Sequence, residues 1–156
     1  KAAEEGKSRD EIIEIVQSTA DRMQHVFTVD DLDYLFRGGR LKKSSAVIGN
    51  MLSIKPVLQV DSEGKLYSYK KVRGNKKLLI EIIDTIKENQ LNIENQTVGI
   101  THADDMEKVE KIEDLMMKEL GVKSFMINSM GCAVGAHTGP GAISIFFLGE
   151  KTGRFE

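Results

Sequence analysis

The sequence has few of the residues that cross-link small proteins or interrupt their helices and strands. Its 156 residues include one cysteine, two prolines and no tryptophan. Cys132 has no second thiol for an internal disulfide or a metal pair, which is typical of a reducing compartment, and we expect a cytoplasmic protein. Low-complexity tracts and internal repeats are also missing from the sequence, which favours an ordinary globular fold over a disordered chain or a repeat array.

Neither sign of charge dominates, and no apolar run is long. The 22 Lys and Arg residues against 24 Asp and Glu residues give a net charge of -2, so any anion site must be local rather than a field over the whole molecule. No apolar run approaches the ~18 residues of a membrane span, and residues 1–10 lack the apolar stretch of a signal peptide. Because the sequence opens at Lys1 in helix-forming residues, we expect a piece of a longer protein whose amino-terminal part is absent.

Hydrophobic periodicity predicts helices and strands in the first half of the chain. Ser8 followed by Glu11 is typical of a capping box, and it predicts a helix to about residue 23. A Gly38-Gly39 pair is expected to end the next helix. The further predicted elements are a strand at 26–29, helices at 32–36 and 44–52, and a hairpin of strands at 54–60 and 65–72.

The second half continues with alternating helices and strands. The predicted elements are helices at 75–89 and 104–120, strands at 98–101, 122–127 and 143–148, and a small-residue helical segment at 131–136. This order predicts an α/β fold in which a mixed β-sheet is covered by helices. No segment rich in proline, glycine or serine divides the chain, so residues 1–156 are expected to form a single α/β domain.

Two arginines lie where the predicted elements end. Arg40 follows Gly38-Gly39, whose glycines allow a sharp turn away from the helix, and Arg73 closes the returning strand of the hairpin. Taken alone, each pattern is more often a solvated arginine at the end of an element than a binding group.

The densest glycine cluster, residues 135–141, precedes the last predicted strand and contains His137. A histidine near a helix carboxyl end tends to keep its proton, because the helix dipole is negative there, and it can then pair with a carboxylate or a phosphate. The alternative is that His137 simply caps the helix.

Other reactive side chains have simpler explanations. His102 with Asp104 and Asp105 makes a poor metal cage, since an aspartate at that place is more often a helix N-cap, and no metal site is predicted. Cys132 has no discernible histidine and aspartate framework for catalysis and is expected to be a small buried residue.

Four short signatures in order resemble the DegV family of bacterial fatty-acid-binding proteins. They are Asp-Leu-Asp-Tyr-Leu with Gly-Gly-Arg at 31–40, Ile-Lys-Pro at 54–56, Lys-Val-Arg-Gly at 71–74 and His-Thr-Gly-Pro-Gly at 137–141. Together they are far more specific than any one alone. The resemblance implies a protein of two α/β domains with a long-chain fatty acid in an apolar tunnel, of which this chain is similar to the second, carboxyl-terminal domain.

The resemblance also implies roles for particular residues. Hydroxyl groups of the missing first domain would hold the carboxylate, while Arg40, Arg73, His137, Thr138 and Gly139 would form a head-group rim or contact a partner. Some family members deliver the acid to a separate fatty acid kinase, so this chain would be a lipid-binding carrier without catalytic residues of its own. Its ligand would be a long-chain fatty acid, with no further cofactor and no nucleic acid or membrane-spanning segment.

We also expect an acyl-chain wall built from apolar residues of several elements, although most of these residues are equally good core residues. The candidates are Ile48, Met51, Leu52, Ile54, Met126, Ile127 and Phe146.

Two other classes of function compete with the carrier. The glycine cluster and the arginines could cradle a phosphate in a transferase or hydrolase, although no nucleophile with its base, no P-loop and no metal cage is evident. A nucleic-acid-binding module would use the lysines around the hairpin, yet acidic residues balance them.

Overall fold

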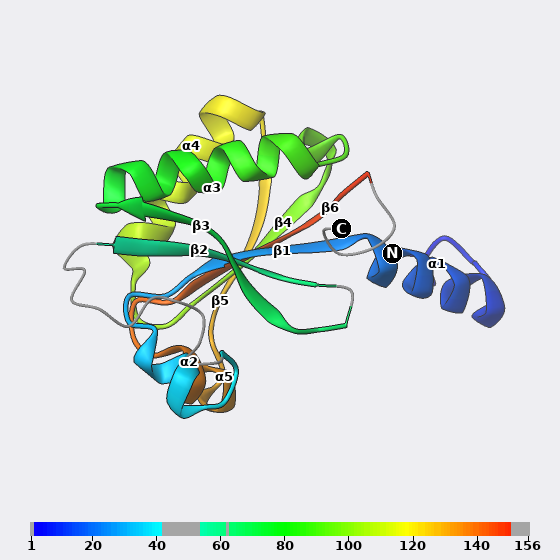
Figure 1. Cartoon of the computed structure of the whole chain (residues 1–156). Coiled ribbons are helices and arrows are strands. Elements are labelled where there is room, and N and C mark those ends of the chain that lie inside the picture. The colour runs from blue at the N-terminus through cyan, green and yellow to red at the C-terminus, as the bar shows by residue number, and fades with distance from the viewer. Residues whose placement is uncertain (1, 42–53, 62, 151–156) are drawn as a thin grey trace.

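The computed structural model describes residues 2–41, 54–61 and 63–150 (Figure 1). In chain order the elements are α1 (Arg9–Arg22), β1 (Met23–Thr28), α2 (Asp33–Arg37), β2 (Ile54–Val60), β3 (Leu66–Arg73), α3 (Asn75–Asn89), the 3-10 helix η1 (Ile93–Asn95), β4 (Thr97–His102), α4 (Met106–Leu120), β5 (Ser124–Ser129), α5 (Cys132–Thr138) and β6 (Ile143–Leu148). Almost every predicted element in these ranges is present, which confirms the α/β fold.

The strands form one six-stranded mixed sheet in the order β3-β2-β1-β6-β4-β5. Only β4 and β5 run parallel, and the other neighbouring pairs are antiparallel. The last strand, β6, is inserted between β1 and β4, so the first and last strands of the chain lie at the centre of the sheet.

One face of the sheet is closed by α3 and α4, which lie side by side above it in Figure 1. Their apolar residues recur at helical spacing and are buried, among them Ile82 and Ile86 of α3 and Ile112 and Met116 of α4. They pack with Val26, Ile100, Ile145 and other strand residues into the larger hydrophobic core. Most of the fold's apolar burial therefore lies on this face.

The opposite face is covered only in part. There α2 and α5 pack together below one end of the sheet in Figure 1, over a small core of Phe27, Val29, Leu35, Leu58 and Ala142. Helix α1 extends from the far end of the sheet and has no buried residue, although Ser8 and Glu11 form the predicted capping box. The helices of the described ranges therefore leave much of this face of the sheet uncovered.

The hairpin departs from simple alternation. Its pairing shifts between Val57 and Leu58, so that Val57 pairs with Lys70 and Leu58 with Ser68. Strict alternation along the returning strand predicts that Leu66 and Val72 share a face. The skipped residue makes this prediction wrong, because Leu66 packs on the small core and Val72 on the larger core. The helix predicted at 44–52 lies outside the described residues, and η1 was not predicted.

Candidate functional site

A hollow of about 360 Å³ lies on the partly covered face of the sheet, beside α2 and α5. Strands, α2 and α5 all contribute apolar side chains to it: Phe27, Leu35, Val60, Leu66, Ala133, Val134 and Phe146. Its polar lining is His25, Arg40, His137, Thr138 and Ser144. A concave apolar surface with a few polar groups is the usual form of a small-molecule site, and its volume falls within the ~300–1,000 Å³ typical of such sites.

Arg40 and His137 are the two predicted rim residues that line this hollow, and a local feature of the chain places each of them. Helix α2 ends at Arg37 with Gly38 as its C-cap, which places Arg40 just beyond it, as predicted. His137 lies in the last turn of α5, also as predicted. The structure thus brings together two residues that are 97 positions apart in the sequence.

Thr138 and Gly139 also lie at this end of α5, but their polar groups are engaged within it. The Thr138 hydroxyl donates to the Val134 carbonyl oxygen at 3.1 Å, and the Gly139 amide donates to the Gly135 carbonyl oxygen at 2.8 Å. Gly139 has a φ of 75°, and a β-carbon there would lie 2.5 Å from Cδ2 of Tyr34. Gly139 therefore serves the packing of α5 on α2.

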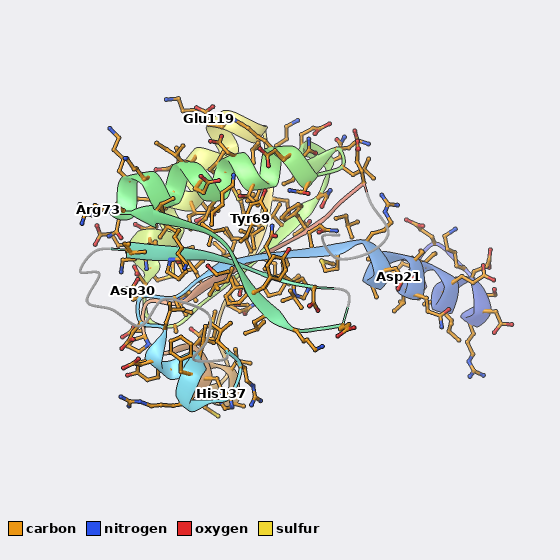
Figure 2. All side chains as sticks on the ribbon, viewed as in Figure 1. Asp21, Asp30, Tyr69, Arg73, Glu119 and His137 are labelled. Atoms are coloured by element: carbon orange, nitrogen blue, oxygen red, sulfur yellow. The ribbon has the colours of Figure 1, made fainter. Side chains whose placement is uncertain are left out.

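Arg73 does not line the hollow. It is exposed at the end of β3, where it pairs with Ile54 of β2, and Figure 2 shows it beside α3, on the other side of the sheet from His137. The hairpin carries its end toward α3, so the closeness expected of Arg40, Arg73 and His137 does not extend to Arg73 within this chain.

The predicted acyl-chain wall divides in the same way. Phe146 lines the hollow, and its ring meets the His25 ring edge to face with centroids 4.9 Å apart. Ile127 packs on the larger core, Met126 is 62% exposed on the edge strand β5, and Ile54 begins β2; none of the three lines the hollow. Ile48, Met51 and Leu52 lie outside the described residues.

Sequence reasoning missed most of the lining. Ser144 shares a face of β6 with Phe146, and strict alternation along that strand could have identified it. His25, Val60 and Leu66 come from strands distant in sequence, and nothing in the sequence indicates that β1 lies between β2 and β6.

A second hollow of about 380 Å³ adjoins the first. It lies between α1 and the start of β1 and is lined by Ile15, Val16, Thr19, Ala20, Met23 and His25. Because His25 lines both hollows, the apolar surface continues from α5 along the sheet to α1.

At the first residues of α4, an ion cluster around the buried Lys108 ties the end of β1 to β2 and α4. Lys108 is 7% exposed, and its Nζ lies 2.7 Å from Asp105 Oδ2 and 3.2 Å from Asp30 Oδ1, while Lys55 Nζ lies 2.8 Å from the same Asp30 oxygen. Burial of the carboxylate by itself would raise the pKa of Asp30, but the hydrogen bond from Lys55 and the charge of Lys108 outweigh it and hold that pKa below its ordinary value. The arrangement is that of a structural clamp.

The glycine-rich loop after α5 has no free amides with which to cradle a phosphate. The Gly139 amide bonds to Gly135, the Gly141 amide donates to the Ala103 carbonyl oxygen at 2.7 Å, and Pro140 has no amide proton. The Gly141 carbonyl oxygen accepts a hydrogen bond of 2.7 Å from the Lys108 ammonium group. The loop therefore anchors α5 to β4 and α4.

Two remaining sequence expectations concern reactive side chains. His102 is buried, and its Nδ1 accepts a hydrogen bond of 3.4 Å from the Asp105 amide. Within the described ranges no cluster of three or more metal-binding side chains occurs. Cys132 is exposed at the start of α5, so the expectation that it is buried was wrong: α5 is a short helix with much of its surface in solvent.

The fold and the hollow define an α/β protein with an apolar hollow edged by polar side chains, and comparison with known proteins gives its family. A family model described as "Uncharacterised protein, DegV family" matches residues 1–150. A DegV domain-containing protein of Clostridium perfringens is 39% identical over 146 residues, which cover 94% of this chain and 50% of that protein. The chain belongs to the DegV family, and it spans about half the length of the curated relatives it matches.

Solved structures agree with the fold. The chain is similar to a fatty-acid-binding DegV family protein of Streptococcus agalactiae, with a TM-score of 0.77 and 33% identity over 96% of this chain and 53% of that one. It also resembles the Fatty Acid Kinase (Fak) B3 protein of Streptococcus pneumoniae, solved with linoleic acid, with a TM-score of 0.84 over 96% of this chain and 52% of that one. At 16% identity the second likeness shows the fold alone. In the described parts of the chain, no helix is both long and apolar enough to cross a bilayer.

Proposed function

We propose that this chain is the carboxyl-terminal domain of a two-domain cytoplasmic carrier for long-chain fatty acids, and that it presents the acyl carboxylate to a partner fatty acid kinase. The observation that carries the proposal is the hollow, where an apolar floor around Phe146 meets Arg40 and His137 at one end. The chain itself supplies no catalytic group, and the phosphoryl chemistry belongs to the kinase.

The acyl tail supplies most of the affinity. Each buried methylene contributes ~0.8 kcal/mol, so a long tail contributes on the order of 10 kcal/mol before the costs of association. We place the tail on the surface that runs past His25 toward Met23 and α1, because the two hollows share His25. The amino-terminal half of the longer protein would close this open face and supply hydroxyl groups for the carboxylate.

The head group needs orientation more than affinity. A guanidinium and an imidazolium both form charge-assisted hydrogen bonds with a carboxylate, and both can neutralise charge as a phosphoryl group arrives. Arg40 and His137 therefore form the head-group rim in this proposal, with Thr138 and Gly139 as its support. We assign Arg73, which is exposed on the α3 side of the sheet, to contact with the kinase.

The streptococcal relative supports the ligand class, since it is described as fatty-acid-binding and is 33% identical to this chain. The alternative, a phosphate-binding transferase or hydrolase domain, has less support. Its glycine loop would have to offer backbone amides to the phosphate, and those of Gly139 and Gly141 are already bonded within the protein.

Two measurements on the natural full-length chain test the proposal. Lipids extracted from the natively purified protein should contain stoichiometric long-chain fatty acid, and a protein that has no bound lipid and does not take up palmitate would overturn the proposal. With the partner kinase, Arg40→Ala and His137→Ala should retain palmitate but slow acyl phosphate formation about tenfold or more. Arg73→Ala should slow the same reaction by raising the KM for the carrier, which separates a docking role from a head-group role.

A further inference from the structure

Gly38 lies against the imidazole of His137. Its backbone has φ -76° and ψ -2°, a right-handed conformation open to any residue, so the backbone itself does not require glycine here. A β-carbon at this position would overlap His137 Nδ1 and come within 3.0 Å of Cγ. The glycine is needed because the histidine ring occupies the space of a side chain.

The same residue also holds Arg40. The Arg40 Nη1 donates a hydrogen bond of 2.7 Å to the Gly38 carbonyl oxygen. Both side chains of the head-group rim therefore contact Gly38. The His137 ring packs against its α-carbon, and the Arg40 guanidinium bonds to its carbonyl oxygen. Among the described residues His137 has no hydrogen bond or ion pair, so packing of the Nδ1 edge on Gly38 positions the ring and leaves Nε2 for a ligand.

A second contact of the same kind fixes the register of the two helices. The Tyr34 ring lies over Gly139, where a β-carbon would be 2.5 Å from Cδ2. Tyr34 precedes Gly38 by four residues and so lies on the same side of α2, and Gly139 follows His137 by two. Each helix thus places a ring against a glycine of the other, and neither can slide without a clash.

We propose that Gly38 is a positioning residue that holds both His137 and Arg40 in place in the head-group rim. This inference deepens the proposed function and rests on it. Because Nδ1 faces Gly38, the imidazole Nε2 lies on the far side of the ring, and we assign Nε2 to the carboxylate of the acyl ligand.

The test uses the natural full-length chain loaded with palmitate carrying ¹³C at its carboxyl carbon. Gly38→Ala should shift the bound carboxyl resonance in the same direction as His137→Ala, while the palmitate content of the protein stays unchanged. Gly135→Ala is the matched control, because it adds the same methyl group within the helix pair at a position with open space around it. An unshifted resonance in Gly38→Ala would overturn the proposal.

The double variant Gly38→Ala/His137→Ala separates positioning from general damage. If Gly38 acts through the ring, the double variant should match His137→Ala in both the carboxyl resonance and the melting temperature, because no ring remains to collide with the new methyl group. Effects that add would show that Gly38 acts by another route. If Gly38→Ala fails to fold, recovery of folding in the double variant supports the contact, and continued failure overturns it.

The outcome can be separated from failure of the proposed function. If the wild-type protein takes up no palmitate, the proposed function and the ligand assignment both fall. The ¹⁵N resonances of the His137 imidazole, recorded without ligand, then decide the remaining claim. They should change in Gly38→Ala and stay unchanged in Gly135→Ala if Gly38 positions the ring.

Discussion

The two faces of the sheet differ in how fully helices cover them. Under α3 and α4 the core is closed, and side chains such as Ile82 and Ile112 are entirely buried. On the other face the described helices α2 and α5 cover only one end, and within the described ranges Phe146 and His25 remain partly exposed beside two hollows. In the proposed function, stability and ligand binding therefore belong to opposite sides of the same strands.

Strand β6 makes this division visible in one segment. Ile143, Ile145 and Phe147 are buried in the larger core, while Ser144 and Phe146 face the hollow. Because neighbouring side chains of a strand point to opposite faces, different residues of this one strand serve the larger core and the hollow. Substitutions can therefore address each face separately.

The largest effect on stability is expected from the closed face. Ile112→Ala removes a fully buried side chain from the centre of α4 and should lower the free energy of unfolding by about 3 kcal/mol, through lost burial and the cavity left behind. Urea denaturation followed by circular dichroism measures the change. The folded fraction should keep the palmitate affinity of the wild type, and a large loss of affinity would contradict the separation of the two faces.

A substitution on the open face should give the reverse result. Phe146→Ala removes part of the hollow's floor and should weaken palmitate binding about tenfold, as expected for the loss of ~1.4 kcal/mol of apolar contact, with little change in unfolding. The matched control is Phe125→Ala, which removes a partly buried ring packed on the larger core. Calorimetry with palmitate and urea denaturation of both variants test the contrast, and identical profiles for the two would refute it.

Local patterns in the sequence were enough to predict most of the elements and parts of the rim. Periodicity located the long helices α3 and α4, and the Gly38-Gly39 pair correctly placed Arg40 just past a helix end. These features depend on residues close in the chain, where helix spacing and capping rules apply directly.

Features that depend on distant residues could not be predicted in this way. The insertion of β6 between β1 and β4 brings His137 to Arg40, and the β-bulge at Val57 and Leu58 divides Leu66 from Val72. Arg73 was grouped with Arg40 because their motifs occur together in the family, yet the hairpin carries it to the α3 side of the sheet. The contact of His137 with Gly38 likewise needs coordinates, since Gly38 looks in sequence like any helix stop.

The smallest effect is expected where the two faces are joined. The ion pairs with Lys55 and Lys108 lower the pKa of Asp30 in the folded protein below the ordinary value of 3.8. As the pH falls below 3.8, Asp30 therefore takes up a proton more readily in the unfolded chain than in the folded protein. The stabilisation is complete above that value and is lost as the pH falls through the folded-state pKa. Asp30→Asn should therefore flatten the dependence of unfolding free energy on pH below about pH 4.

The size of this effect follows from exposure. The Asp30 side chain is 40% exposed, so solvent screening limits the contribution to about 0.5 kcal/mol. Lys55→Met should flatten the same profile less than Asp30→Asn does, because Lys108 remains beside the carboxylate. Urea denaturation at several pH values between 2.5 and 6 measures both variants. If the unfolding free energy of Asp30→Asn depended on pH as steeply as that of the wild type, the Asp30 carboxylate would not be the group responsible for the loss of stability in acid.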